Sequence, residues 1–242
     1  MSAEGSAFGA DASQSDASTR VAVVTGAGRG IGAGIAERLA ADGMQVVGID
    51  RAPGTDLTLD VTDRAAVHEA LGALDRIDVV VNCAMWIRYE HIEEVDEETV
   101  DGMLAVGLKS CFWTTQAALP KMRAQGGGVI VHMASPAALH GFPTAGVYSA
   151  IKGAVAAFTR QSAVELAPDN VRVNAVVPGA IPTPGAREVV DDAGYEYRRQ
   201  RTPLGRLGTP GDIAGGVAFL ASEDAAFMTG QLLVLDGGIT VA

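Results

Sequence analysis

Three side chains of this sequence could together move a proton. Tyr148 and Lys152 are four residues apart, so on a helix they lie on one face. A phenol, with an ordinary pKa of about 10, is a poor base near neutrality, but a nearby ammonium group favours its phenolate. We therefore expect Lys152 to lower the pKa of Tyr148, which could then take a proton from an alcohol or return it. Ser135, at the end of an apolar run, could hydrogen-bond the same oxygen.

A second group of residues could bind phosphate. Residues 21–36, VAVVTGAGRGIGAGIA, place five glycines between an apolar run and an amphipathic one. Glycine lets the backbone turn tightly and approach a ligand, and the N–H groups of a following helix bind anions. The string GRGIGA also fits the dinucleotide pattern G-x-G-x-x-G/A, which has many chance matches. The loop predicts a pyrophosphate site.

An acidic residue after the second apolar run indicates which dinucleotide this loop would bind. Asp50 lies 20 residues after Gly30. A carboxylate at this place can accept hydrogen bonds from both hydroxyls of an adenosine ribose and repels a 2′-phosphate, so it favours NAD over NADP. Arg29 and Arg51 argue the other way, because either could pair with a 2′-phosphate. We give the carboxylate more weight and expect NAD, with NADP as the alternative.

The rest of the chain contains the elements that would position these groups. Short apolar runs alternate with longer helical patterns, and continuous apolar strands are typical of a parallel sheet covered on both faces. We expect one α/β domain over residues 20–242, a seven-stranded doubly wound parallel sheet with its ligands at the carboxyl ends of the strands. The expected strands are 21–24, 45–49, 57–59, 78–82, 128–133, 171–177 and 231–235. The expected helices are 31–42, 63–74, 97–122, 147–167 and 210–221.

One connection is too short for the usual crossover. Only residues 51–56, with a proline and a glycine among them, separate the run that ends at Asp50 from the one near Leu57. A parallel crossover normally takes a dozen or more residues, usually with a helix. We expect this helix to be missing, and the sheet face beside it to be less covered or covered by a neighbouring subunit.

Composition argues against several other classes of function. A formal net charge of −11 speaks against a nucleic-acid partner. No apolar run reaches about 18 residues, so no membrane span is expected. Cys83 and Cys111 are expected to be buried thiols, and the four histidines show no metal-binding spacing, so we expect no metal. Residues 1–19 lack the features of a secretory signal, and we expect a disordered tail on a cytoplasmic protein.

Several motifs occur in the order and spacing of a known family. The matching stretches are TGAGRGIG (25–32), the Asp60-Val61 pair, YSAIK (148–152) and NAVVPG (174–179). They resemble the glycine loop, the adenine-contacting D-V pair, the Y-x-x-x-K and the N-x-x-x-P-G of the short-chain dehydrogenases/reductases. Ser135 lies 13 residues before Tyr148, where the catalytic serine of that family falls. The resemblance covers residues 20 to 242.

The resemblance implies a Rossmann fold, a nicotinamide cofactor, and hydride transfer between that cofactor and a secondary alcohol or ketone. It also implies a homo-oligomer, either a tetramer or a dimer. Ser135, Tyr148 and Lys152 would be catalytic, and Lys152 would also hold the nicotinamide ribose. The family spacing leaves Gly28 and Gly34 less constrained than the other loop glycines. The expected cofactor-binding residues are Gly26, Arg29, Gly30, Ile31, Asp50, Asp60, Val61, Asn82, Ala84, Tyr148, Lys152, Pro178, Gly179, Ile181 and Thr183.

The sequence departs from the family in two places. Where the family usually reads N-N-A-G, residues 82–85 are NCAM, so we expect Met85 to line the nicotinamide or substrate pocket. Gly107 stands where the family has a fourth catalytic residue, an asparagine that supports a water chain from the lysine. A backbone carbonyl and an extra water could replace that side chain, or the enzyme could be slow. A nucleotide-binding sensor that has lost turnover is the third interpretation.

Three loops should form the substrate pocket, at 85–91, 136–143 and 180–201. Their aromatic residues favour an apolar or cyclic substrate. Arg88, or the arginines of the run 198–201, could pair with a substrate carboxylate or lie on an exposed face. The residues expected to line the pocket are Met85, Trp86, Arg88, Pro136, Phe142 and Tyr195.

Overall fold

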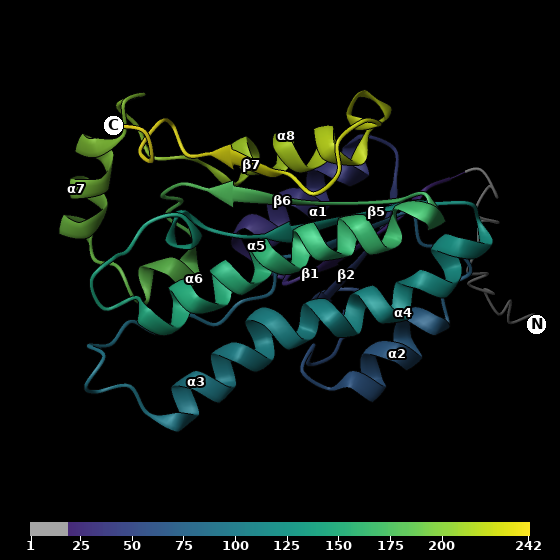
Figure 1. The fold of residues 1–242 in the computed structure, drawn as a ribbon, viewed down its shortest axis with the longest axis horizontal. Helices are drawn as coiled ribbons and strands as arrows, with labels where there is room; N and C mark the ends of the chain where they lie inside the picture. Colours follow the sequence, from purple (N-terminus) through teal and green to yellow (C-terminus); the bar gives the residue numbers. More distant parts are fainter. Residues whose placement is uncertain (1–18) are drawn as a thin grey trace, which may run out of the picture.

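Seven strands, all parallel, form the centre of the computed structural model, which describes residues 19–242 (Figure 1). They are β1 (Val21–Thr25), β2 (Gln45–Asp50), β3 (Leu57–Thr58), β4 (Val79–Asn82), β5 (Gly128–Met133), β6 (Val171–Pro178) and β7 (Leu232–Leu235). Their order is β3-β2-β1-β4-β5-β6-β7, which reverses direction between β1 and β4. This is the doubly wound sheet that the sequence predicted. The tail predicted over 1–19 lies, apart from Thr19, outside the described residues.

Eight α-helices surround the sheet in the described part of the chain. They are α1 (Gly30–Ala41), α2 (Arg64–Gly72), α3 (Glu97–Leu104), α4 (Ser110–Ala124), α5 (Gly146–Leu166), α6 (Pro184–Arg187), α7 (Asp192–Arg201) and α8 (Pro210–Ala221). The helix predicted over 97–122 is interrupted by a π-helical segment, Ala105–Lys109. Helix α7 was not predicted, because Tyr195 is its one buried residue and its sequence lacks an apolar stripe.

Two hydrophobic layers cover opposite faces of the sheet. Successive strand residues point to opposite faces, so Val24 packs in the layer beneath α1 and α8 while Val23 packs in the layer of α2, α4 and α5. Both valines are fully buried. Figure 1 shows α8 on one side of the strands and α4 and α5 on the other. The continuous apolar strands are therefore explained by burial on both faces.

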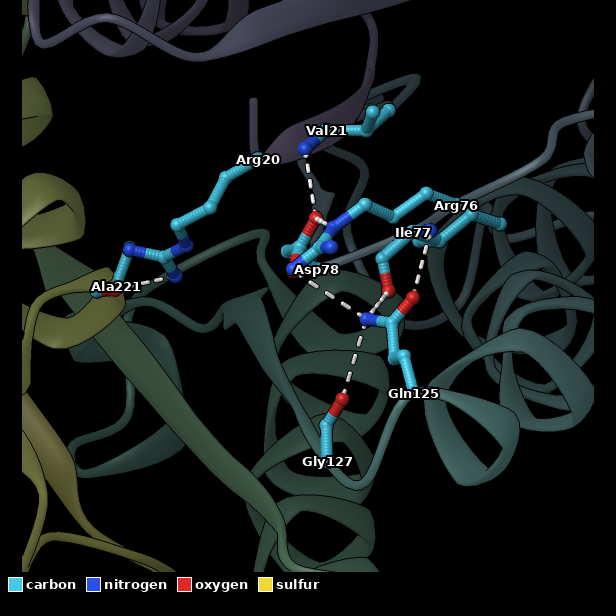
Figure 2. Close-up of polar contacts among 8 residues, drawn as sticks. All are labelled: Arg20, Val21, Arg76, Ile77, Asp78, Gln125, Gly127 and Ala221. Carbon is cyan, nitrogen blue, oxygen red and sulfur yellow. Dashed lines mark hydrogen bonds and ion pairs between the residues drawn. The ribbon is translucent and has the colours of Figure 1, made fainter. Parts of the chain in front are cut away.

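Polar contacts tie the amino ends of the strands together (Figure 2). The carboxylate of Asp78, just before β4, accepts hydrogen bonds from the Val21 N–H at 2.8 Å and from Arg76 Nε at 2.7 Å. The Gln125 amide, at the end of α4, donates to the Ile77 carbonyl at 2.6 Å. These contacts fix β1 and β4 relative to α4, at the sheet edge opposite the carboxyl ends of the strands.

The crossover between β2 and β3 contains no helix, as predicted. Residues 51–56 connect the two strands, which pair in parallel at Ile49 and Leu57. Asp56 stabilises this short connection by accepting a hydrogen bond from the Gly48 N–H at 2.8 Å. Residues 51–54 are exposed. Cover by a neighbouring subunit stays a prediction.

The sequence predicts neither a membrane-spanning segment nor a metal site. None of their helices is both long and apolar enough to cross a membrane. Within residues 19–242, no group of three or more His, Cys, Asp or Glu side chains is arranged to hold a metal ion.

Candidate active site

The glycine loop joins β1 to α1 and leaves the first turn of the helix open. Gly26 has a φ of +68°, and a Cβ on Gly32 would overlap the Gly26 carbonyl oxygen. Arg29 is the N-cap residue of α1, and its side chain makes no capping hydrogen bond. The N–H groups of the first turn are therefore not capped by it, and the glycine backbone lets a ligand approach them. This arrangement fits the pyrophosphate of a dinucleotide.

Gly28 and Gly34 are more constrained than the family spacing implied. A Cβ on Gly28 would lie 2.9 Å from Asp50 Oδ2, and one on Gly34 would lie 2.8 Å from the Cβ of Pro210 in α8. Gly28 lets the loop approach the acidic residue, and Gly34 lets α1 pack closely on α8. The family spacing considers only the ligand, so these packing contacts add to it, and neither position has the positive φ of Gly26 and Gly30.

Asp50 favours NAD and Arg29 favours NADP, and the two side chains differ in what they contact. The Asp50 carboxylate lies beside the loop, where it accepts hydrogen bonds from the N–H groups of Gly28 at 3.1 Å and Ala52 at 3.0 Å. Arg29 points away to Glu188, which its Nη1 contacts at 2.8 Å. Both members of this ion pair are exposed. One of the two basic groups that could receive a 2′-phosphate is therefore already paired with a carboxylate, while the other, Arg51, is exposed next to Asp50.

The segment after β4 lies directly on the glycine loop. Thr25 Oγ1 accepts hydrogen bonds from the N–H groups of Cys83 at 3.0 Å and Ala84 at 3.1 Å. A Cβ on Gly26 would lie 2.9 Å from Ala84 Cα. Ala84 is thus placed at the predicted cofactor cleft.

The Asn82 side chain, by contrast, is used inside the protein. Its Oδ1 accepts a hydrogen bond from Thr114 Oγ1 at 2.7 Å, and its Nδ2 lies 3.1 Å from His132 Nδ1. Asn82 is buried and connects β4 to β5 and α4. The prediction that this residue binds the cofactor therefore has no support from its side chain.

The remaining predicted cofactor residues form two further walls. A Cβ on Gly30 would lie 3.0 Å from Thr183 Cβ, which places Thr183 next to the first turn of α1. Gly179, after Pro178, packs closely against Asp236. The Ile181 side chain lies in the hydrophobic core, which leaves only its backbone for contact with a cofactor. On the other wall Val61 is buried, and Asp60 accepts a hydrogen bond from the Thr62 N–H at 2.8 Å.

Ser135, Tyr148 and Lys152 come together at the carboxyl end of β5. Ser135 follows the strand; its Oγ accepts a hydrogen bond from the Ala137 N–H at 3.2 Å, and its hydroxyl is near enough to Tyr148 to lower the pKa of that phenol. Lys152, one turn along α5, is buried and donates from Nζ to the Met133 carbonyl at 2.7 Å. The Lys152 nitrogen lies 5.7 Å from the centre of the Tyr148 ring. The structure therefore places the three predicted catalytic residues in one site.

The pKa values differ from the sequence expectation. Burial raises the pKa of Tyr148, and the hydrogen bond with Ser135 counteracts this in part. Burial also lowers the pKa of Lys152, while the nearby thiols of Cys111 and Cys83 raise it. We expected the lysine to lower the tyrosine pKa. In this structure desolvation of the phenolate is the larger effect, and Ser135 is the group that opposes it.

The segment 85–86 packs on the long helix through two glycines. A Cβ on Gly107, in the π-helical segment, would lie 2.8 Å from Met85 Sδ and 2.8 Å from Ile151 Cγ2. A Cβ on Gly102 would lie 2.6 Å from Trp86 Cζ3. The Met85 thioether and the Trp86 ring were expected to line the substrate pocket. Both side chains are half-buried and contact the helix, where glycines leave room for them, and their role in the pocket stays a prediction.

The other predicted pocket residues differ in their contacts and exposure, and their role in the pocket stays a prediction. Arg88 was expected to be available for a substrate carboxylate, but its guanidinium contacts Glu90 Oε1 at 3.1 Å and Thr99 Oγ1 at 3.1 Å. Phe142 is exposed to solvent. Pro136 begins a short 3₁₀-helix after Ser135 and is half-buried, so it remains next to the catalytic serine.

Tyr89, one of the aromatic residues of the predicted pocket loop 85–91, lies beside the catalytic tyrosine. Its ring meets the Tyr148 ring edge to face, with centroids 5.8 Å apart. Burial raises the pKa of Tyr89 to about 12. The contact depends on a bridge between distant segments, in which the Glu90 N–H donates to the Thr144 carbonyl at 2.8 Å. The aromatic composition of 85–91 was the one available signal.

Comparisons with known proteins give matches over most of the chain. A family model described as enoyl-(acyl carrier protein) reductase matches residues 26–240. The chain is 37% identical over 259 residues to the short-chain reductase protein NovJ of Streptomyces niveus, covering 93% of this chain and 98% of that protein.

Two solved structures have the same fold. A 3-ketoacyl-(acyl-carrier-protein) reductase from Brucella melitensis, complexed with NADH, is 32% identical with a TM-score of 0.85, covering 92% of this chain and 98% of that one. A gluconate 5-dehydrogenase from Burkholderia cenocepacia, in complex with NADP and tartrate, is 32% identical with a TM-score of 0.87, covering 92% and 96%. The predicted Rossmann-type fold is confirmed.

Proposed function

This chain belongs to the short-chain dehydrogenase/reductase family, and we propose that within it the protein is an NAD-dependent oxidoreductase that interconverts a secondary alcohol and its ketone. The observation that supports this most is the grouping of Ser135, Tyr148 and Lys152, with the lysine held by the Met133 carbonyl at 2.7 Å. We assign the catalytic domain to residues 20–242.

The chain's own residues would handle the proton of the reacting group. A bound nicotinamide would supply the hydride acceptor or donor. The Tyr148 phenolate takes the proton of the alcohol, and the phenol returns it in the reverse direction. Ser135 donates a hydrogen bond to the same substrate oxygen and orients it. Lys152, buried and fixed to β5, provides a positive charge beside the phenolate that forms.

NAD is the cofactor that the charges around the glycine loop favour. Asp50 lies next to Gly28, where a ribose with free hydroxyls fits and a 2′-phosphate is repelled. Arg29 is paired with Glu188. The uncapped first turn of α1 and Thr183 complete the set of groups that would hold the dinucleotide. Replacing Asp50 by Asn should remove the preference for NAD.

An assay of secondary alcohols and ketones with each cofactor tests this function. Formation or loss of reduced nicotinamide is followed by absorbance. We expect turnover with NAD that falls by at least about a hundredfold in Tyr148→Phe, in line with the usual contribution of a general base. Equal rates in the wild type and in Tyr148→Phe would overturn the proposal. Faster turnover with NADP would favour the alternative, an NADP-dependent carbonyl reductase.

Gly107 and Met85 favour a second candidate, a nucleotide-binding protein with weak turnover. No side chain at position 107 can support a water chain from Lys152. This candidate predicts that NAD raises the melting temperature while no substrate of the panel is turned over. Any Tyr148-dependent turnover excludes it.

We further propose that the protein is a homo-oligomer in the cytoplasm. Phe112 on α4 and Val164 on α5 expose apolar surface on the helix layer of one sheet face, which suits contact with a second copy. The molecular mass in solution, measured by light scattering, and fractionation of cells test these two statements.

A further inference from the structure

The arginines around the substrate loops differ in their partners. Arg88 is paired with Glu90, Arg187 with Asp192 at 2.9 Å, and Arg199 with Glu196 at 2.6 Å. Among the residues that the structure describes, Arg198 has no carboxylate within ion-pair distance, and its Nη1 donates to the Gly194 carbonyl at 3.2 Å. Arg198 is half-buried on α7. Its guanidinium therefore keeps donor capacity that no acidic side chain of the described residues uses.

Tyr195 lies beside this guanidinium and has an unused hydrogen-bonding group. It is only 5% exposed, and within the described part of the chain its buried hydroxyl has no hydrogen-bond partner. The Arg198 guanidinium lies 6.0 Å from the centre of its ring, and that of Arg187 lies 5.1 Å from it. A buried hydroxyl without a partner is unfavourable, and a ligand oxygen that accepts its hydrogen bond would remove the cost.

Tyr89 connects these two residues with the catalytic tyrosine. The Tyr89 ring is in edge contact with the Tyr148 ring. Both Arg198 and Tyr195 act electrostatically on the Tyr89 hydroxyl, and Arg198 lowers its pKa against the larger effect of burial. Tyr89 therefore contacts Tyr148 on one side and lies within electrostatic range of the Arg198–Tyr195 pair.

We infer that Arg198 and Tyr195 form a subsite for a carboxylate of the substrate, so that the substrate is a hydroxy acid or the matching keto acid. The inference rests on the proposed function and names the substrate class of the same site. A guanidinium binds a carboxylate with two parallel hydrogen bonds, and the Tyr195 O–H can donate to an oxygen of the same ligand. The carboxylate would lie on the α7 side of the carbon that reacts at Tyr148.

Matched pairs of acid and neutral alcohol test this inference in steady-state kinetics with NAD. The pairs are lactate with propane-1,2-diol, 3-hydroxybutyrate with butane-1,3-diol, and gluconate with glucitol. We expect the acid of at least one pair to have a kcat/KM at least about tenfold above that of its neutral partner, which is a modest effect for a charge-assisted hydrogen-bonded pair. Turnover of neutral alcohols without any preference for the acids would overturn the inference and leave the proposed function standing.

Two variants and one control assign that preference to the subsite. Arg198→Met should raise KM for the acid at least about tenfold and leave the neutral substrate unchanged, and Tyr195→Phe should act in the same direction more weakly. Arg201→Met, on the same helix but over the exposed Tyr197 ring, should change neither. Equal losses on acid and neutral substrates in Arg198→Met, or equal effects of Arg198→Met and Arg201→Met, would overturn the inference.

A binding measurement separates this inference from the proposed function. Tartrate, with threitol as its neutral counterpart, is added to the protein with NAD, and the melting temperature is measured. We expect tartrate to raise it in the wild type and in Arg201→Met but not in Arg198→Met, and threitol to have no effect. Absence of all turnover would refute the proposed function, while protection by tartrate that survives in Arg198→Met would refute the subsite.

Discussion

The sulfur of Met85 lies 2.8 Å from the position that a Cβ on Gly107 would occupy. Two departures from the family pattern, distant in sequence, therefore form one packing unit, with a large side chain on the loop and none on the helix. The π-helical segment Ala105–Lys109 presents Gly107 to this contact. A side chain at position 107 would have to displace the Met85 thioether and would also meet Ile151.

The first prediction concerns the coupling of this pair. Gly107→Asn should destabilise the protein by about 1–3 kcal/mol, because the new side chain meets Met85 and Ile151 in a packed site. Met85→Gly should also destabilise it, because it leaves a cavity. The double variant should recover at least about 1 kcal/mol of the summed loss, as expected for residues in contact. Urea denaturation of the four proteins gives the coupling energy, and simple additivity would contradict the prediction.

The second prediction concerns the pH dependence of turnover. Burial raises the pKa of Tyr148, so the phenolate that accepts the alcohol proton forms only at alkaline pH, and alcohol oxidation should accelerate as pH rises. The hydrogen bond with Ser135 lowers that pKa, so Ser135→Ala should move the rise to higher pH as well as slow the reaction. Profiles of kcat/KM against pH measure both effects.

The neighbouring residue Ser149 offers a matched control for that experiment. Its buried hydroxyl has no hydrogen-bond partner among residues 19–242, so Ser149→Ala should leave the pH profile in place. An alkaline shift in Ser149→Ala as large as that in Ser135→Ala would show that the profile does not report the Ser135–Tyr148 hydrogen bond.

The third prediction concerns cofactor choice. Glu188→Gln should release Arg29 from its ion pair, which is exposed and therefore worth up to about 1 kcal/mol. The freed guanidinium can meet a 2′-phosphate, so KM for NADP should fall by up to about fivefold while KM for NAD changes little. Asp192→Asn, which releases Arg187 instead, is the control. An equal fall of KM for NADP in both variants would show that the effect does not come from Arg29.

The fourth prediction concerns acid stability. Burial lowers the pKa of His132 from 6.5 to about 3. Between pH 6.5 and about 3, His132 is therefore protonated in the unfolded chain but neutral in the folded protein. The free energy of unfolding should therefore fall as pH drops from 6.5 towards 3, by about 1.4 kcal/mol per unit from this group. His132→Asn can still accept a hydrogen bond from Asn82. It should reduce the slope of the unfolding free energy against pH by the contribution of one proton, about 1.4 kcal/mol per pH unit. Urea titrations at several pH values measure it, and parallel slopes would contradict the assignment.

Much of the fold could be predicted because its signals are local. The apolar runs of β1 and β4 exist because those strands are buried on both faces, and the short segment 51–56 alone excluded a crossover helix. Ser135, Tyr148 and Lys152 could also be assigned, because two of them share a helix face and the third ends the adjoining strand.

The substrate side could not be predicted in the same way, because its contacts join residues far apart in sequence. Arg29 and Glu188 are 159 positions apart, and nothing in either segment indicates their pairing. Arg88 is paired with Glu90, and this contact depends on the conformation of the loop that holds both residues. Met85 and Trp86 pack on the long helix because Gly102 and Gly107 leave space on another element.

The attachment of Lys152 to the end of β5 has an evolutionary consequence. The acceptor Met133 and the catalytic Ser135 lie two positions apart at that strand end, and Tyr148 and Lys152 share α5, so the proton-handling groups depend on one strand and one helix. The loops and α7, which we propose contact the rest of the substrate, are attached to other elements. Mutations there can change which molecule is accepted while the proton-handling groups are kept, and two structural relatives at 32% identity accordingly have names that refer to different substrates.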